Sequence, residues 1–170
     1  MMIISRAILA AGLVTLSINP ARAEDAPACT SFAWSVARER AAFGATGLPA
    51  LATGSTLSGS VSAAQLTLKP AAEAALPVPS EKEAKPDTFA GFVTMTVPAA
   101  GMYQVTLSDE AWIDVSQDGR SVLKPAAHSG KKGCPEVRKS VRFALDAGAV
   151  TIEISRASSQ QIKLDLLNAE

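Results

Sequence analysis

The sequence predicts an all-β fold: an antiparallel β-sandwich of the jelly-roll type with one short N-terminal helix. Three observations predict it. Apolar and polar residues alternate from Phe89 to the C-terminus, the alternating runs are short, and Gly, Asp, Ser and Pro separate them at regular intervals. The clearest run starts at Gly101, where Tyr103, Val105 and Leu107 alternate with polar residues. One face of such a strand is apolar, so a second sheet must cover it.

Residues 89–170 therefore form the predicted sandwich core. A turn at Asp118-Gly119 suits the left-handed backbone that glycine tolerates, and Asp146 to Ala149 supply another turn. Loop residues are expected from Pro125 to Pro135. Alternation predicts strands over residues 89–97, 101–108, 111–115, 141–145, 150–154 and 162–166.

Residues 24–69 form an N-terminal segment that is expected to pack on the sandwich. Phe32, Trp34 and Val36 alternate as in a strand, although Phe32, Val36 and Phe43 also fall on one side of a helix. We interpret residues 31–36 as a strand that leads into a short helix. The small residues of 44–59 predict a loose surface connection, and Leu66 and Leu68 mark a strand within 60–69.

Residues 70–88 are predicted to be a long exposed crossover. Four prolines remove backbone donors, and the charged residues Glu73, Glu81, Lys82, Glu83 and Lys85 favour water. This composition is typical of a solvated connector that belongs to neither sheet, with a partner-binding loop as the alternative.

The first 23 residues have the features of a signal peptide. Arg6 is followed by an apolar run from Ala7 to Ile18, and Ala21-Arg22-Ala23 is a small-x-small cleavage site. The run is shorter than the roughly 20 residues that span a bilayer. We therefore expect export to the periplasm or outside the cell, with cleavage near Ala23, and no membrane-spanning segment in the mature chain.

The charge and cysteine content restrict the function further. Arg6 and Arg22 precede the cleavage site, so the mature chain has 14 basic and 16 acidic residues, which argues against nucleic-acid binding. Cys29 and Cys134 are expected to pair in an oxidising compartment. A reactive or metal-bound thiol is the alternative, although the chain has no Cys-x-x-Cys and no clustered histidines.

From Phe89 onward the chain resembles the PA14-type and pre-peptidase-type β-sandwich modules of secreted proteins. The motifs that carry the resemblance are Phe89-Ala90-Gly91-Phe92, Pro98 to Tyr103, Leu107-Ser108-Asp109-Glu110, Val115 with Asp118-Gly119, and Leu145 to Gly148. The resemblance implies a β-sandwich. In sugar-binding PA14 modules an Asp-Asp pair helps to hold calcium, and here Asp109-Glu110 occupies that place.

No pattern in the sequence indicates catalysis. His128, the one histidine, lies in a loop of small residues, where a triad or a facial metal site would need further partners. The carboxylates Asp109, Glu110, Asp114 and Asp118 lie close together in sequence and are interpreted as turn and surface residues, with a calcium site as the alternative. We expect no cofactor.

The functional hypotheses rest on Trp112. If Ile113 and Val115 face the core, Trp112 faces outward and can bind a glycan or a protein, unless the proline-rich crossover buries it. The leading hypothesis is an exported, non-enzymatic module that binds an envelope glycan or an envelope protein through Trp112 and the loops at 109–119 and 125–135. The alternatives are a structural or chaperone-like subunit that pairs through a strand edge, and a hydrolase with an unrecognised site. A basic region from Lys124 to Arg142 offers contact with anionic polymers or lipid headgroups.

Overall fold

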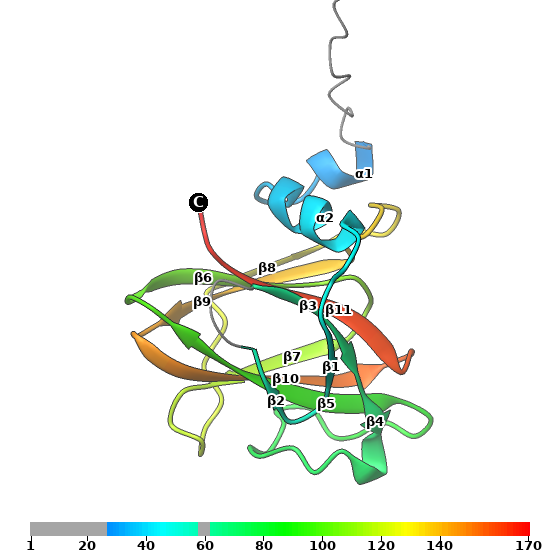
Figure 1. Cartoon of the computed structure of the whole chain (residues 1–170), viewed down its shortest axis with the longest axis vertical. Coiled ribbons are helices and arrows are strands. Elements are labelled where there is room, and N and C mark those ends of the chain that lie inside the picture. The colour runs from blue at the N-terminus through cyan, green and yellow to red at the C-terminus, as the bar shows by residue number, and fades with distance from the viewer. Residues whose placement is uncertain (1–26, 58–61) are drawn as a thin grey trace, which may run out of the picture.

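A computed structural model describes residues 27–57 and 62–170, and the fold is a two-sheet β-sandwich (Figure 1). Strands account for 44% and helices for 11% of the described residues, which confirms the predicted all-β class. The predicted signal peptide, residues 1–23, lies outside the described residues.

The two sheets contain strands from the whole described chain. Sheet A has six strands, in the order β1 (Ala50–Ala52), β3 (Ala63–Thr67), β11 (Gln161–Asn168), β6 (Gly101–Leu107), β9 (Lys139–Leu145) and β8 (Ala127–Gly130). Sheet B has five: β2 (Ser55–Thr56), β5 (Phe89–Val97), β10 (Gly148–Ala157) and β7 (Trp112–Ser116) in order, with β4 (Lys69–Pro70) paired to β5. The long neighbouring strands are antiparallel, whereas the short pairs β1–β3 and β2–β5 are parallel.

The core lies between the sheets and uses the predicted alternation. On β6 the side chains of Tyr103, Val105 and Leu107 are buried in it, and β10 contributes Ile152 and Ile154. Burial of each such side chain stabilises the fold by about 1.5–3 kcal/mol. The remaining large side chains that are almost fully buried in this core are Phe143, Leu66, Leu68, Ile162 and Leu164.

The N-terminal segment differs from the prediction. Residues 31–36 form no strand; they follow the short helix α1 (Pro27–Thr30) as a turn and bends, and the expected helix is α2 (Ala37–Gly44). The alternation was misleading because Phe32 and Val36 belong to a separate small apolar cluster with Cys29. The predicted pair Cys29–Cys134 is bonded, with the two Cα atoms 4.8 Å apart. Since β3 lies inside sheet A, this segment contributes strands as well as covering the sandwich.

Two more predictions need correction. Residues 44–59, expected as a loose connection, contain β1 and β2, and the expected loop 125–135 contains β8. The crossover is attached more closely than expected, because β4 pairs with β5 and Val78 is buried. A short 3-10 helix, η1 (Ala71–Glu73), follows β4.

The chain passes from sheet A to sheet B at a tight corner between β1 and β2. There Gly54 N donates to Phe92 O and Phe92 N donates to Thr53 Oγ1, both at 2.8 Å. A Cβ on Gly91 would lie 2.6 Å from that Thr53 oxygen, so glycine is required for this approach. The corner therefore closes one flank of the sandwich.

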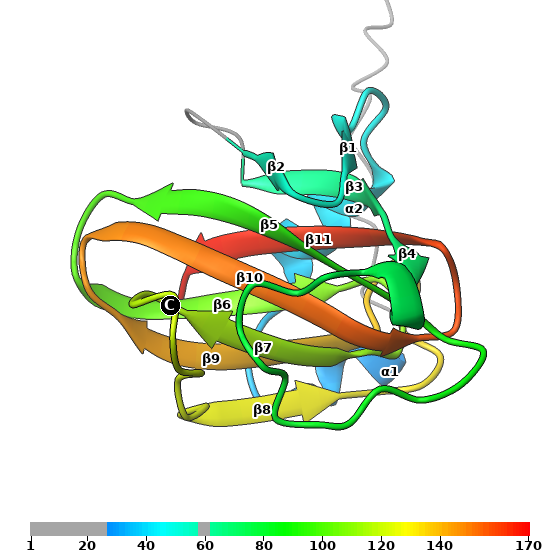
Figure 2. The same cartoon turned by 90° about the horizontal axis from the view of Figure 1, so that it is seen from below.

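Two segments cover the outer faces of the sheets (Figures 1 and 2). We call residues 27–48, which include α1 and α2, the N-terminal cap; it lies on sheet A. We call residues 74–83 of the crossover the strap; it runs across the outer face of sheet B, over β10 and β7. The protein thus has four layers: cap, sheet A, sheet B and strap.

Candidate functional site

The candidate site lies on the flank where β7 ends sheet B and β8 ends sheet A. A pocket of about 120 Å³ opens between these strands. Its lining residues are Trp112 and Ile113 from β7, His128 from β8, Lys139 and Val141 from β9, and Pro125. The structure thus brings Trp112 together with part of the 125–135 region, as the sequence-based hypothesis requires.

Strand phase places Trp112 on the outer face of sheet B. Ile113 and Val115 are buried in the core, so Trp112 and Asp114 point the other way. The indole Nε1 donates to Asp114 Oδ1 at 2.9 Å, and the ring is half-buried. Both predicted alternatives therefore hold in part: Trp112 faces outward, and the crossover partly covers it.

Two ammonium groups lie against the indole ring. Lys82 Nζ, from the strap, is 4.8 Å from the ring centroid, and Lys139 Nζ is 5.0 Å away. Lys139 also donates to Ala111 O at 2.9 Å, and burial lowers the pKa of its ammonium. Because cations occupy the ring surface, Trp112 is better suited to forming a pocket wall than to stacking on a sugar.

Beside Trp112, two buried carboxylates hold the strap on sheet B. Asp114 and Glu153 are directly opposite each other on β7 and β10. Asp114 Oδ2 accepts from Ser80 Oγ at 2.6 Å and from Glu81 N at 3.2 Å, and Glu153 Oε1 accepts from Val78 N at 2.8 Å. Burial raises the pKa of Glu153, with the Asp114 carboxylate adding to the effect. This arrangement positions the strap rather than leaving Asp114 open to a ligand.

Of the other predicted carboxylates, Asp109 and Asp118 lie apart from this site, and Glu110 borders it through its charge interaction with Lys139. Asp109 is exposed and accepts from Ser108 Oγ, whereas Glu110 forms an ion pair with Arg138. Asp118 closes its own turn: backbone N–H groups of Arg120 and Ser121 donate to it at 2.8 Å and hold its pKa below the usual range. Among the described residues, no three His, Cys, Asp or Glu side chains are grouped to hold a metal ion.

The residues of the basic region are likewise spread over different environments. Lys124, Lys131 and Lys132 are exposed, but Arg142 Nη2 donates to Gln104 Oε1 and its guanidinium lies 4.3 Å from the centre of the Trp34 ring. Of this region, Lys139 lines the pocket. Sequence reasoning placed Pro125 and His128 in the predicted binding loop but missed Val141, whose place beside His128 depends on the pairing of β8 with β9.

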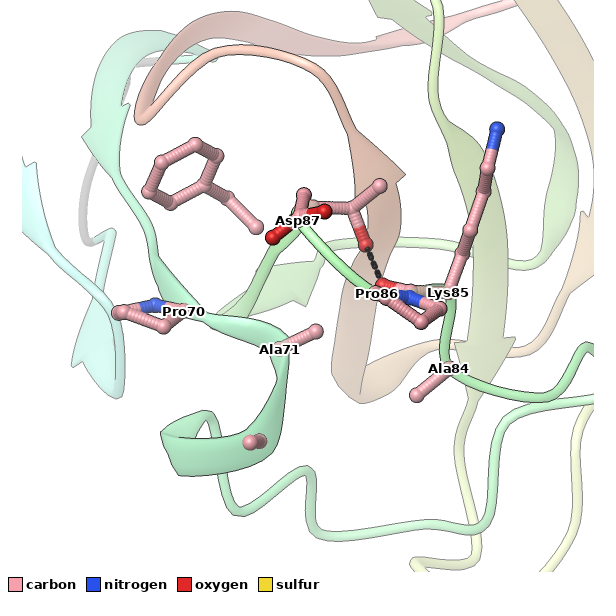
Figure 3. A pocket seen from close by; sticks show the side chains of 9 residues that line it. Pro70, Ala71, Ala84, Lys85, Pro86 and Asp87 are labelled. Atoms are coloured by element: carbon pink, nitrogen blue, oxygen red, sulfur yellow. Dashed lines mark hydrogen bonds between the residues drawn. The ribbon is translucent and has the colours of Figure 1, made fainter.

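A second hollow, of about 690 Å³, lies at the base of the crossover (Figure 3). Pro70 and Ala71 line one side, and Lys85, Pro86 and Asp87 line the other. Its lining is mainly small and apolar, and Thr88 Oγ1 fixes the turn by donating to Lys85 O at 2.5 Å. It offers fewer directed polar groups than the β7–β8 flank, so it is the weaker candidate.

Comparisons with known proteins give no assignment: no family model, no curated protein and no solved structure matches this chain. Within the described ranges, no helix is long and apolar enough to span a membrane. The functional argument therefore rests on the flank itself.

Proposed function

We propose that the protein is an exported, non-enzymatic binding module of the cell envelope, and that its β7–β8 flank binds a segment of a partner protein. The observation that carries the proposal is the small apolar pocket between two sheet edges, with Lys82 and Lys139 beside it. A signal-type N-terminus and the Cys29–Cys134 bond support export.

The chemistry of the pocket favours a protein segment over a glycan. A volume of about 120 Å³ suits one apolar side chain and is smaller than the roughly 300–1,000 Å³ of typical small-molecule sites. The ring surface that a sugar would use is occupied by ammonium groups. Those ammonium groups favour carboxylates in the partner, so the expected ligand has a leucine-like residue flanked by Asp or Glu.

Binding of synthetic ten-residue peptides tests this function. The probes carry one leucine flanked by glutamates. In one matched peptide lysines replace the glutamates, and in another serine replaces the leucine. Binding to immobilised envelope polysaccharides is measured in parallel. We expect binding to the acidic leucine peptides, weakened about fivefold to tenfold by Lys139→Met, because the charge is lost while the stem still covers Trp112. Lys131→Met, at an exposed lysine outside the pocket, is the matched control. Binding to the polysaccharides and to no peptide would overturn the proposal in favour of a glycan.

One observation favours a second candidate, an accessory subunit that pairs through a strand edge. In the described chain β8 ends sheet A, and its residues Ala127, His128 and Gly130 are exposed. A terminal strand with small side chains offers its backbone groups to an added strand. N-methylation of alternate peptide amides separates the two: it abolishes binding by strand addition and leaves binding by a side-chain anchor unchanged.

A further inference from the structure

The part of the outer face of sheet A that lies beneath the cap is polar, yet it is buried. Gln104 and Thr106 on β6, Ser140 on β9 and Asp165 on β11 are at most 1% exposed. The cap covers them, with Phe32, Val36 and Phe43 in its own apolar cluster (Figure 1). A polar layer enclosed in this way requires partners for every donor and acceptor.

Most groups in this layer are paired with one another. Gln104 Nε2 donates to Glu39 Oε1 on the cap, and Gln104 Oε1 accepts from Arg142. Thr106 Oγ1 and Trp34 Nε1 both donate to Ser140 Oγ, at 2.9 and 3.1 Å. These hydrogen bonds already use the side-chain donors of Gln104, Thr106, Arg142 and Trp34.

Asp165 takes part in none of these hydrogen bonds. It is 0% exposed, and neither of its oxygens has a hydrogen-bond partner among the described residues; Glu39 Oε2, also on a 0% exposed side chain, has none either. The residues opposite Asp165 are Ala63 and Thr106, of which the first has no polar side chain and the second donates to Ser140. The nearby Leu166 N donates to Ser62 O.

The surrounding charges do not neutralise this carboxyl. From α2, Glu39 opposes its ionisation and Arg38 favours it, but Arg38 is exposed and bonded to Asn168 O and Glu170. On the same strand, Lys163 donates to Phe43 O and Glu136, and on β9 Arg142 is held by Gln104 and Glu170 O. β3 contributes no charged side chain over Ala63–Thr67. After burial, the Ser62 hydroxyl has the largest influence on the pKa of Asp165; it favours the ionised form without overcoming burial. A proton is the smallest partner that removes the buried charge.

We propose that Asp165 is a proton-binding site that links docking of the N-terminal cap to pH: the cap is held closely on sheet A when the Asp165 carboxyl is protonated and loosens when it ionises. Cys29–Cys134 keeps the loosened cap attached at one end. Loosening exposes the polar layer and the region around Glu39 to water.

The titration range follows from the environment. Burial, the largest cause, raises the pKa of Asp165 from 3.8 to about 6. The docked state therefore binds the proton more tightly than the undocked state does. Docking is strongest below pH 4, weakens as the pH rises from about 4 to about 6, and is constant above that range.

Amide hydrogen exchange of the full chain tests the proposal. We expect protection factors over residues 37–44 to fall by about tenfold to a hundredfold between pH 4 and pH 7, since each unit of pKa shift corresponds to a factor of ten. In Asp165→Asn the fall should disappear, with high protection at both pH values. Asp109→Asn, at an exposed carboxylate, is the matched control and should behave like the wild type.

Several results would overturn the proposal. One is an equal fall in Asp165→Asn; another is a carboxyl resonance of Asp165 that titrates near pH 4 in the wild-type protein, a readout that does not depend on the variant folding. Restoration of protection at pH 7 by calcium, and its loss with chelator, would show that the unpaired oxygens hold a metal ion instead of a proton.

Discussion

Two segments outside the sandwich each cover a polar part of one sheet, and a pair of carboxylates lies at each contact. The strap lies over Asp114 and Glu153, and the cap lies over Asp165 and contributes Glu39. The strap is irregular, so its backbone N–H groups at Val78 and Glu81 are free to donate to the carboxylates. Beyond its first turn, α2 uses its N–H groups within the helix and can offer side chains alone. Each side still leaves one glutamate oxygen without a hydrogen-bond partner among the described residues, Glu153 Oε2 and Glu39 Oε2. The two sides therefore differ at the aspartates: both oxygens of Asp114 accept hydrogen bonds, and neither oxygen of Asp165 does.

The cap and the strap also differ in how they are attached to the sheets. The cap is attached by a covalent bond and an apolar cluster in addition to side-chain hydrogen bonds. The strap is attached by hydrogen bonds to carboxylates and by burial of Ala74 and Val78. The following predictions test this contrast, beginning with the largest effect.

Replacing both Cys29 and Cys134 by serine removes a bond that spans 105 positions of the chain. We expect the free energy of unfolding, measured in urea, to fall by about 4 kcal/mol, because the unfolded chain regains its loop entropy. Hydrogen exchange should increase over the cap and stay unchanged over the strap. A loss below about 1 kcal/mol would contradict the covalent attachment of the cap as its main support.

Asp114→Ala removes the acceptor for Ser80 Oγ, Glu81 N and Trp112 Nε1. The donors are partly buried or exposed, so each lost hydrogen bond costs about 0.5–1 kcal/mol, and we expect a loss of about 2 kcal/mol in unfolding free energy and faster exchange over the strap. Asp109→Ala, at an exposed carboxylate, should change stability by less than about 0.5 kcal/mol. Unchanged strap exchange in Asp114→Ala would show that the strap is held by other contacts.

At neutral pH, Asp165→Asn should raise the free energy of unfolding, whereas Asp114→Ala should lower it. Burial raises the pKa of Asp165 to about 6, so the wild-type protein loses stability as the pH rises from about 4 to about 6 and the variant does not. We expect the variant to be more stable by about 2 kcal/mol at pH 7 and the difference to vanish near pH 4. Thermal unfolding across this range measures it. A variant that is less stable at pH 7 would mean that Asp165 is ionised and paired.

Lys82→Ala should have the smallest effect. It removes one ammonium group from the Trp112 ring and leaves the backbone donors of the strap in place. We expect a loss of about 0.5–1 kcal/mol in unfolding free energy with the strap still docked. Lys85→Ala, at an exposed position of the same crossover, is the control. If the strap detaches in Lys82→Ala, side-chain contacts and not backbone donors hold it.

The sandwich was predictable because burial on one face of a long strand imposes a period of two. Tyr103, Val105 and Leu107 satisfy that pattern, as do the apolar residues of β10. β8 could not be predicted in this way, since Ala-His-Ser-Gly has no apolar alternation and its strand conformation depends on pairing with β9. The incorrect strand at 31–36 has a related cause, because a turn anchored at Cys29 also buries Phe32 and Val36.

The only part of the site that strand phase could predict is the direction in which Trp112 points. The phase of Ile113 and Val115 indicated that Trp112 faces outward, and it does. The partners of Trp112 come from distant segments: Lys82 lies on the strap, and Lys139 lies on the other sheet. Proximity in sequence instead suggested Asp109 and Asp118, which the fold directs into separate turns.

The corner at Thr53, Gly54 and Gly91 makes one backbone position decide the packing of a whole flank. There the backbone of β5 is bonded directly to the chain that joins β1 and β2. A side chain at position 91 would have to displace both Thr53 and Leu68, so a single substitution there would disturb the corner and a core residue together.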